Sequence, residues 1–219
     1  MQAHARQPRY TVGEEIAHAV THGVGLVLSI AGLVTLVVMA TTRGDAWHIV
    51  GCAVFGATLV LLYGASTLYH GIRHANAKRL LQRFDHAAIF LLIAGTYTPL
   101  GLVSLRDGWG WMLLGLVWSL AVLGITLQVV VPTWARYLSV PLPLAMGWLA
   151  LIALEPLARS LHPDGLALLV AGGVAYTLGV VFYAWRRLPF NHAVWHAFVM
   201  AGSAFHFSCV IGYVLPPAV

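Results

Sequence analysis

Charged residues are scarce along this chain: they make up 9% of its 219 residues, whereas 60% are hydrophobic. An average soluble domain carries about 25% charged and about 45–50% apolar residues. A water-soluble fold of this size could not cover its surface with so little charge, so the composition indicates an integral membrane protein. The chain has two cysteines, which excludes a scaffold held together by disulfides.

Seven apolar stretches are long enough to cross a bilayer, which takes roughly 20 residues each. They lie near 19–41, 47–70, 84–105, 109–131, 137–154, 165–185 and 191–215. We therefore expect an all-α fold, with a seven-helix transmembrane bundle over residues 19–219 and a cytoplasmic segment over residues 1–18. The fifth stretch contains Pro141 and Pro143, so neighbouring helices would have to satisfy the backbone groups that these prolines free.

The basic residues sort to one side of the predicted membrane. Seven spans put the termini on opposite sides, and nine of the twelve Lys and Arg residues fall on the N-terminal side: Arg6, Arg9, Arg73, Lys78, Arg79, Arg83, Arg136, Arg186 and Arg187. By the positive-inside rule the N-terminus is cytoplasmic and the C-terminus outside. Topology and anionic headgroups explain the net charge of +5. A nucleic-acid partner is therefore not expected.

Two histidines at the start of the seventh span have the spacing of a metal-binding pair. His192 and His196 are four residues apart, which places both rings on one helical face, about 6 Å apart along the axis. His70, at the end of the second span and on the same side of the membrane, could supply a third ligand. Three histidines with an open fourth position are typical of a catalytic Zn²⁺ site. Alone, the histidine pair is a weak signal, and hydrogen bonding at the interface is the alternative.

Two further polar residues lie at the same predicted depth. Asp85 opens the third span and could hold a metal-bound water or orient a ligand histidine. Ser66 is one helical turn before His70 and could hydrogen-bond that water or a substrate group. Ionisable residues within spans are expensive and mark functional positions, so Asp85 and Ser66 are the candidate catalytic residues.

The remaining intramembrane histidines have simpler interpretations. His206 is ten residues beyond His196, about 15 Å deeper, so it cannot share the metal and is expected to be a buried, hydrogen-bonded residue. His18 and His22 could line a cavity from the first span, although interfacial packing is the favoured interpretation.

These motifs resemble one membrane-protein family. The residues that carry the resemblance are Ser66-Thr-Leu-Tyr-His70, Asp85 and His192-Ala-Val-Trp-His196, on seven spans with a cytoplasmic N-terminus. They resemble the progestin and adipoQ receptor (PAQR) family. Gly13-Glu14-Glu15-Ile16 with Thr21-His22-Gly23 resembles its bacterial hemolysin III branch. The sequence departs from that branch at His18, where a polar amide is expected.

The resemblance implies a function and a place in the cell. In the family, the histidines matching His70, His192 and His196 bind zinc, and the aspartate matching Asp85 lies beside it. The larger superfamily includes alkaline ceramidases, which implies a zinc-dependent hydrolase acting on an amide or ester of a membrane lipid. The bacterial branch implies the inner (plasma) membrane.

Other functions stay open at this stage. The first alternative is a receptor-like or membrane-homeostasis protein in which zinc is structural, so it is uncertain that the chain is an enzyme. Pore formation ranks third, because the spans offer no run of charged residues to line a wide aqueous path. Lys78 is the only lysine and lies in a predicted loop, so a retinal-binding role is not expected. The expected partners are membrane lipids.

Overall fold

A computed structural model describes residues 10–106, 108–131 and 137–215 of the chain. Within these ranges every regular element is helical, and seven helical segments are long and apolar enough to cross a membrane. The predicted all-α, seven-span class is therefore confirmed, and the chain is a multi-pass membrane protein. Arg6, Arg9 and Arg136, which entered the charge count, lie outside the described residues.

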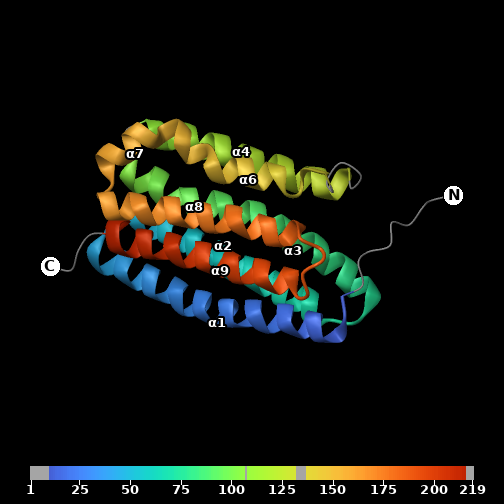
Figure 1. The fold of residues 1–219 in the computed structure, drawn as a ribbon. Helices are drawn as coiled ribbons and strands as arrows, with labels where there is room; N and C mark the ends of the chain where they lie inside the picture. The colour runs from blue at the N-terminus through green and yellow to red at the C-terminus, as the bar shows by residue number, and fades with distance from the viewer. Residues whose placement is uncertain (1–9, 107, 132–136, 216–219) are drawn as a thin grey trace.

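Four of the spans are single helices, and three combine two or more segments (Figure 1). The elements in chain order are α1 (Val12–Arg43), α2 (Ala46–Gly71), α3 (Ala75–Pro99), the π-helical turn η1 (Leu100–Ser104), α4 (Trp109–Val130), α6 (Pro141–Gly147), the 3-10 segment η2 (Trp148–Ala153), α7 (Leu154–Ser160), α8 (Pro163–Ala184), α9 (Asn191–Cys209) and the π-helical turn η3 (Val210–Val214).

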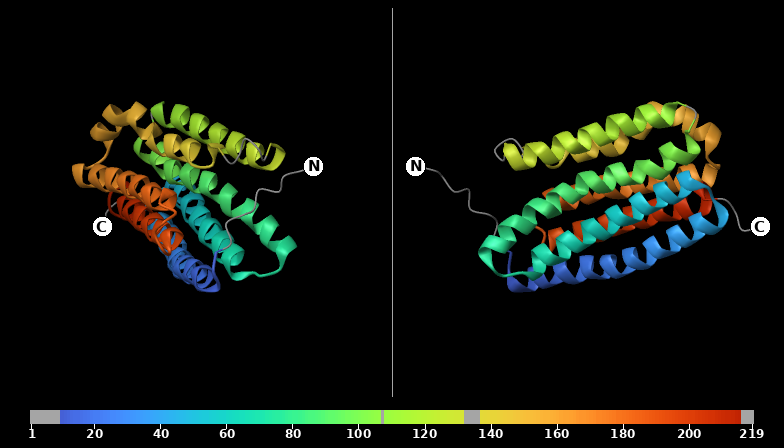
Figure 2. Two further views of the ribbon diagram at one scale, coloured as in Figure 1. Left: turned by 45° about the vertical axis from the view of Figure 1, so that its right-hand side comes forward. Right: turned by 180° about the vertical axis from the view of Figure 1, so that it is seen from behind.

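The helices pack largely in sequence order. Seen from behind, α1, α2, α3 and α4 lie side by side, while α8 and α9 pair on the other face of the bundle (Figure 2). The last helix α9 also packs against α1, so the first and last spans meet. The start of α1 and the end of η3 lie at opposite ends of the molecule, as an odd number of spans requires (Figure 1).

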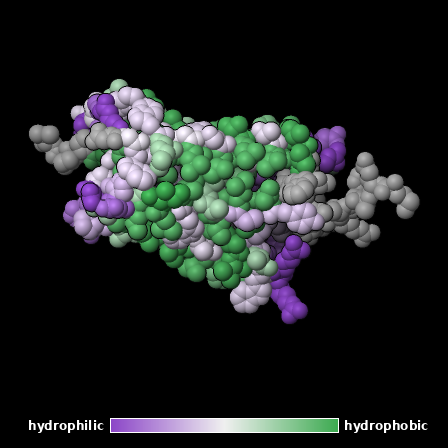
Figure 3. Space-filling model, turned by 90° about the horizontal axis from the view of Figure 1, so that it is seen from above, coloured by the Kyte–Doolittle hydropathy of each residue, from purple (hydrophilic) through white to green (hydrophobic). Residues whose placement is uncertain are grey.

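The surface has the polarity of a membrane protein. Hydrophobic residues cover the middle of the molecule, and hydrophilic residues gather at its two ends (Figure 3). Large apolar side chains are exposed along the spans, Val27 and Val130 at 68%. At one end Lys78 Nζ lies 2.9 Å from a carboxylate oxygen of Glu15, and at the other Arg106 lies 3.2 Å from Asp45. The charged groups thus pair outside the apolar band.

The interior holds two apolar clusters. One lies mainly among α1, α2, α3 and α9 and includes Leu36 and Phe55, and the other joins α3 to α4 and α6 through Phe90, Leu113 and Met146. The two clusters meet along α3, which is the most buried of the spans. This position lets α3 support side chains that face both halves of the bundle.

The first helix begins seven residues before the expected boundary of 19. Thr11 is its N-cap, and a reciprocal capping box joins Thr11 to Glu14: the Glu14 backbone N–H donates to Thr11 Oγ1 at 3.3 Å, and the Thr11 backbone N–H donates to Glu14 Oε2 at 2.8 Å. The residues from Val12 to His18, expected before the span, are therefore helical. Glu15 and His18 consequently lie on the helix that packs against α2 and α9.

The fifth span runs over Pro141–Ser160 instead of the expected 137–154, and it is broken. Pro141 occupies the first helical turn of α6, where its missing N–H costs nothing. The break at η2 precedes Pro156, which cannot donate to the carbonyl four residues earlier.

A tyrosine from α3 satisfies the backbone at this break. The Tyr97 hydroxyl donates to the carbonyl oxygens of Met146 and Gly147, at 3.1 and 2.8 Å, and accepts from the Ala150 N–H at 2.8 Å. A neighbouring helix thus satisfies freed backbone groups, as expected for a broken span in lipid.

Candidate metal centre

Three histidines from two helices meet near one end of the bundle. His70 ends α2, and His192 and His196 occupy the first two turns of α9. One ligand atom from each ring lies within 4.8 Å of the other two, which fits a metal site after a small contraction. The ring centroids are 5.3 Å apart for His70 with either partner and 4.5 Å apart for His192 and His196. The structure therefore brings together the three histidines proposed from the sequence.

A carboxylate from α1 orients His70. Glu15 Oε2 lies 2.8 Å from His70 Nδ1, and because a carboxylate only accepts, Nδ1 carries the proton. The buried Nε2 of the same ring has no hydrogen-bond partner and is available as a ligand. Lys78 pairs with the other Glu15 oxygen. A carboxylate on the far nitrogen of a ligand histidine fixes its tautomer and orientation. The sequence analysis did not identify this role of Glu15.

His18 and His22 belong to the same cluster, so the favoured interpretation of interfacial packing was wrong. Their side chains are buried, at 0% and 4% exposure. The His18 ring centroid lies 4.7 Å from that of His70 and 4.8 Å from that of His192, and the His22 ring stacks on His196 at 3.5 Å. The early start of α1 is the physical reason, since it places both residues on the face that packs against α2 and α9.

Many ring nitrogens of this cluster lack a hydrogen-bond partner within the described ranges. Seven buried ring nitrogens have no hydrogen-bond partner among the described residues: both nitrogens of His18 and His22, Nε2 of His70, and Nδ1 of His192 and His196. A buried polar group without a partner costs about 1–3 kcal/mol. Imidazole nitrogens are good ligands for zinc and similar metals. The residues present therefore fit a metal ion.

Tyr10 covers the cluster from the segment before α1. Its ring centroid lies 4.8 Å from that of His18 and 5.4 Å from that of His192. Burial against these rings raises the pKa of the Tyr10 hydroxyl to about 12. Tyr10 is therefore neutral near pH 7 and adds no charge beside the histidines.

The two candidate catalytic residues lie beside the cluster and outside the three-ligand groups. Asp85, on α3, lines a cavity that His192 and His196 also line. Ser66 is fully buried on α2, and its hydroxyl interacts with the Asp85 carboxylate. The Asp85 carboxylate and the histidine rings thus face one cavity.

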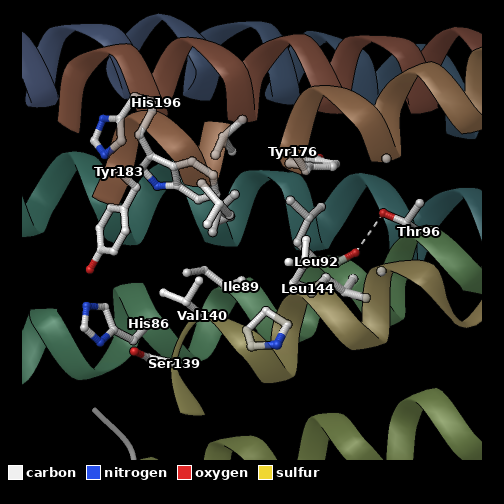
Figure 4. Close-up of a pocket in the computed structure, with 18 of the residues that line it drawn as sticks. His86, Ile89, Leu92, Thr96, Ser139, Val140, Leu144, Tyr176, Tyr183 and His196 are labelled. Atoms are coloured by element: carbon white, nitrogen blue, oxygen red, sulfur yellow. Dashed lines mark hydrogen bonds between the residues drawn. The ribbon is translucent and has the colours of Figure 1, made fainter. Parts of the chain in front are cut away.

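This cavity has a volume of about 160 Å³ and runs between α3, α6, α8 and α9 (Figure 4). Near the histidines its wall includes His86, Ser139 and Tyr183, and farther along it is mainly apolar, with Ile89, Leu92, Val140 and Leu144. The cavity therefore joins a polar head to an apolar tail.

His206 lines the far part of the cavity and takes no part in either three-ligand group. Its Nε2 donates to the backbone carbonyl of Leu169 at 3.1 Å. His206 is thus a partly buried residue whose ring is hydrogen-bonded, as the sequence predicts, and it lies outside both candidate ligand groups.

Comparison with known proteins assigns the chain to a family. Residues 10–207 match the family model for haemolysin-III-related proteins. The chain belongs to this family. It is 46% identical over 207 residues to hemolysin-3 of Bacillus cereus, covering 94% of each chain. It is 48% identical over 204 residues to a hemolysin-3 homolog of Bacillus subtilis (strain 168), covering 93% of this chain and 96% of the relative.

A more distant similarity reaches a human protein. The monocyte to macrophage differentiation factor is 26% identical over 216 residues, which cover 93% of this chain and 86% of the relative. No solved structure shows a significant match. The resemblance to the hemolysin III branch and to PAQR-type proteins is thus confirmed at the level of sequence.

Proposed function

We propose that this hemolysin III family protein holds Zn²⁺ with His70, His192 and His196 and hydrolyses an amide or ester bond of a membrane lipid. The observation that carries the proposal is a three-histidine constellation of which two members, His192 and His196, lie on the wall of an elongated, mostly apolar cavity. The charge distribution of the sequence favours the cytoplasmic side of the membrane for this reaction, and the bacterial relatives support the inner membrane as its location.

Three imidazoles leave one position of a tetrahedral zinc site open, which is the arrangement of catalytic zinc. When bound, zinc would lower the pKa of a water towards 7 and polarise the scissile carbonyl. Glu15 holds the His70 ring through Nδ1, so that Nε2 is the nitrogen offered to the metal. Glu15 is a positioning residue and does not touch the substrate.

Asp85 is the proposed general base. Its carboxylate faces the same cavity as His192 and His196, and it takes up a proton from the attacking water and returns it to the leaving group. The Ser66 hydroxyl interacts with the Asp85 carboxylate, and in this proposal it donates to that carboxylate or to the polar head of the substrate. Ile89, Leu92 and Leu144 pack against the acyl chain and exclude water from it.

A structural or sensing role is the second candidate. His70 is on α2, His192 and His196 are on α9, and the Glu15 contact adds α1, so a metal at this point would fix three helices at one end of the bundle. Such a protein would use zinc for stability and would turn over no lipid. The mainly apolar wall of the cavity does not favour an aqueous pore.

The test combines metal analysis with lipid turnover on purified protein. We expect one or more Zn²⁺ per chain in the native protein, release of a fatty acid from at least one lipid of a ceramide and glycerolipid panel, and loss of that release in Asp85→Asn with zinc retained. Glu155→Gln is the matched control, because Glu155 is an exposed carboxylate paired with Arg159 on another span.

Each alternative result has a distinct meaning. Full zinc in the native protein with no turnover of any lipid overturns the hydrolase and supports the structural role. Zn²⁺ content and Zn²⁺ affinity that are both unchanged in His192→Ala overturn the assignment of the triad, whereas residual binding with reduced affinity does not.

A further inference from the structure

A second group of three ligands lies next to the triad. Glu15, His18 and His70 each offer an atom within 4.8 Å of the other two. We propose that these residues form a second position for a divalent transition metal, which shares His70 with the triad. The inference goes beyond the hydrolase proposal and does not rest on it.

The unpartnered nitrogens support a second position. An ion on the triad takes one nitrogen from each of three rings, which accounts for three of the seven buried nitrogens without partners. The four that remain are both nitrogens of His18 and both of His22. His18 is completely buried, and no hydrogen-bond donor or acceptor of the described residues reaches its ring. A ligand that binds nitrogen is therefore the missing partner of His18.

The geometry selects Glu15 as its companion. Glu15 and His18 are three residues apart on α1 and lie on one face of the helix. His18 meets His70 in an edge-to-face arrangement, with ring centroids 4.7 Å apart and planes at 70°. Glu15 already touches His70 Nδ1 at 2.8 Å. An ion between the three would thus bind two imidazoles and one carboxylate.

This ligand set defines the class of metal. Two histidines and one glutamate are a known zinc ligand set, whereas Mg²⁺ and Ca²⁺ prefer oxygen ligands throughout. The Glu15 carboxylate also supplies one negative charge towards the dication. Binding through His70 Nδ1 displaces the proton that this nitrogen donates to Glu15, and the proton leaves to solvent.

Each three-ligand group has one partly exposed member, Glu15 in the second position and His192 in the triad. The Glu15 side chain is 21% exposed and that of its partner Lys78 is 25% exposed, whereas the His70 side chain is fully buried. Glu15 is thus the partly exposed ligand of the second position, and His70 is the buried ring common to both positions.

The test removes the triad and asks what still binds. In His192→Ala/His196→Ala, Glu15, His18 and His70 remain, and we expect about one Zn²⁺ or Co²⁺ per chain, measured by elemental analysis after gel filtration and by the visible absorption of Co²⁺. Adding His18→Asn to that background weakens the remaining binding at least about tenfold, because it removes one of three ligands.

His22→Asn in the same background is the matched control. His22 is also buried on α1 with both nitrogens unpartnered, but it belongs to neither three-ligand group, so its replacement leaves the binding in place. Circular dichroism and gel filtration check the fold. If the double variant is not monodisperse, the same comparison is made in His196→Ala alone, with His18→Asn and His22→Asn added in turn.

Two results would overturn the proposal. One is that the variant without the triad binds no more metal than the same variant carrying His18→Asn. The other is that His18→Asn and His22→Asn reduce binding equally, which would indicate a diffuse cluster instead of a defined position. Lipid turnover enters neither measurement, so failure of the hydrolase proposal and failure of this one are told apart.

Discussion

The two ends of the bundle treat the same residue types in opposite ways. At the start of α2, the Asp45 carboxylate accepts from the backbone N–H groups of Trp47 and His48, at 2.9 and 3.2 Å, and lies 2.7 Å from the His48 ring. Arg106 completes this exposed group at 3.2 Å. At the other end, His18, His22, His70, His192 and His196 are packed together with seven unpartnered nitrogens.

The difference separates a cap from a binding site. Asp45 is half exposed, and both Asp45 and His48 have local partners, so they stabilise the start of a helix and need nothing more. The histidine cluster is buried and lacks partners, which costs about 1–3 kcal/mol for each such group. Residue type alone therefore says little about function in this protein. Burial without a partner is the observation that points to a ligand.

The largest effect on zinc affinity is expected from substitution of His196. In His196→Ala the triad loses one of three ligands, and if the binding free energy of roughly 10–16 kcal/mol is shared equally, zinc affinity falls about 10²- to 10⁴-fold. Competition with a chromophoric chelator measures the change. His48→Ala, at the opposite end, is the control and leaves the affinity unchanged. An equal loss in both variants would mean that the two ends do not differ as described.

A smaller effect is expected at Glu15. Glu15→Gln removes the carboxylate that fixes the His70 ring, and the loss of such a partner weakens metal binding about 10- to 100-fold. The same chelator competition measures it, with Glu155→Gln as the control for loss of a carboxylate. Unchanged affinity would show that packing alone orients His70.

Substitution of Thr11 tests whether the N-cap of α1 affects zinc affinity. Thr11→Ala removes the acceptor of the Glu14 N–H, and loss of an N-cap costs about 1 kcal/mol, or about fivefold in an equilibrium. Because Glu15 and His18 follow within two turns, zinc affinity falls by a factor of this size. Thr11→Ser keeps the hydroxyl and restores the affinity. If the serine variant is as weak as alanine, the cap is not the cause.

The smallest effect is expected at Asp45. Asp45→Ala lowers the thermal midpoint in detergent by a few degrees at most and leaves zinc affinity unchanged. The hydrogen bond from the His48 ring lowers the pKa of Asp45 to about 2 from an ordinary value of 3.8. A carboxylate with a depressed pKa stabilises the fold above pH 3.8, and this contribution is lost as the pH falls through 2.

The midpoints of native protein and Asp45→Ala should therefore differ at neutral pH and converge between about pH 4 and pH 2. Thermal unfolding followed by circular dichroism at several pH values measures this. A difference that grows on acidification would contradict the assigned sign.

Much of this arrangement was predictable from local spacing. Long apolar stretches gave the spans, and the four-residue spacing of His192 and His196 gave one face of α9. His70 could be added because the charge count placed the end of the second span at the same side of the membrane. These inferences need only helix periodicity and a membrane of known thickness.

The sequence analysis did not predict that α1 contributes to the histidine cluster, because the charged residues before position 19 were assigned to a cytoplasmic segment. Glu14 and Glu15 were counted outside the membrane, so the helix was begun at residue 19. The signal that could have corrected this is Thr11 followed three residues later by Glu14, a capping box that predicts a helix from Val12. Glu15, His18 and His22 then fall on one face by spacing alone. Their contacts with α2 and α9 are tertiary and could not be read from the chain.

The hydrogen bonds at the broken fifth span have a consequence for the wall of the cavity. Tyr97 fixes α6 to α3 at Met146 and Gly147, which is the end of α6. Ser139, which lines the cavity near the histidines, precedes the other end of α6. Tyr97 and Gly147 both line the cavity, so the tyrosine that satisfies the broken backbone also holds two walls of the cavity together.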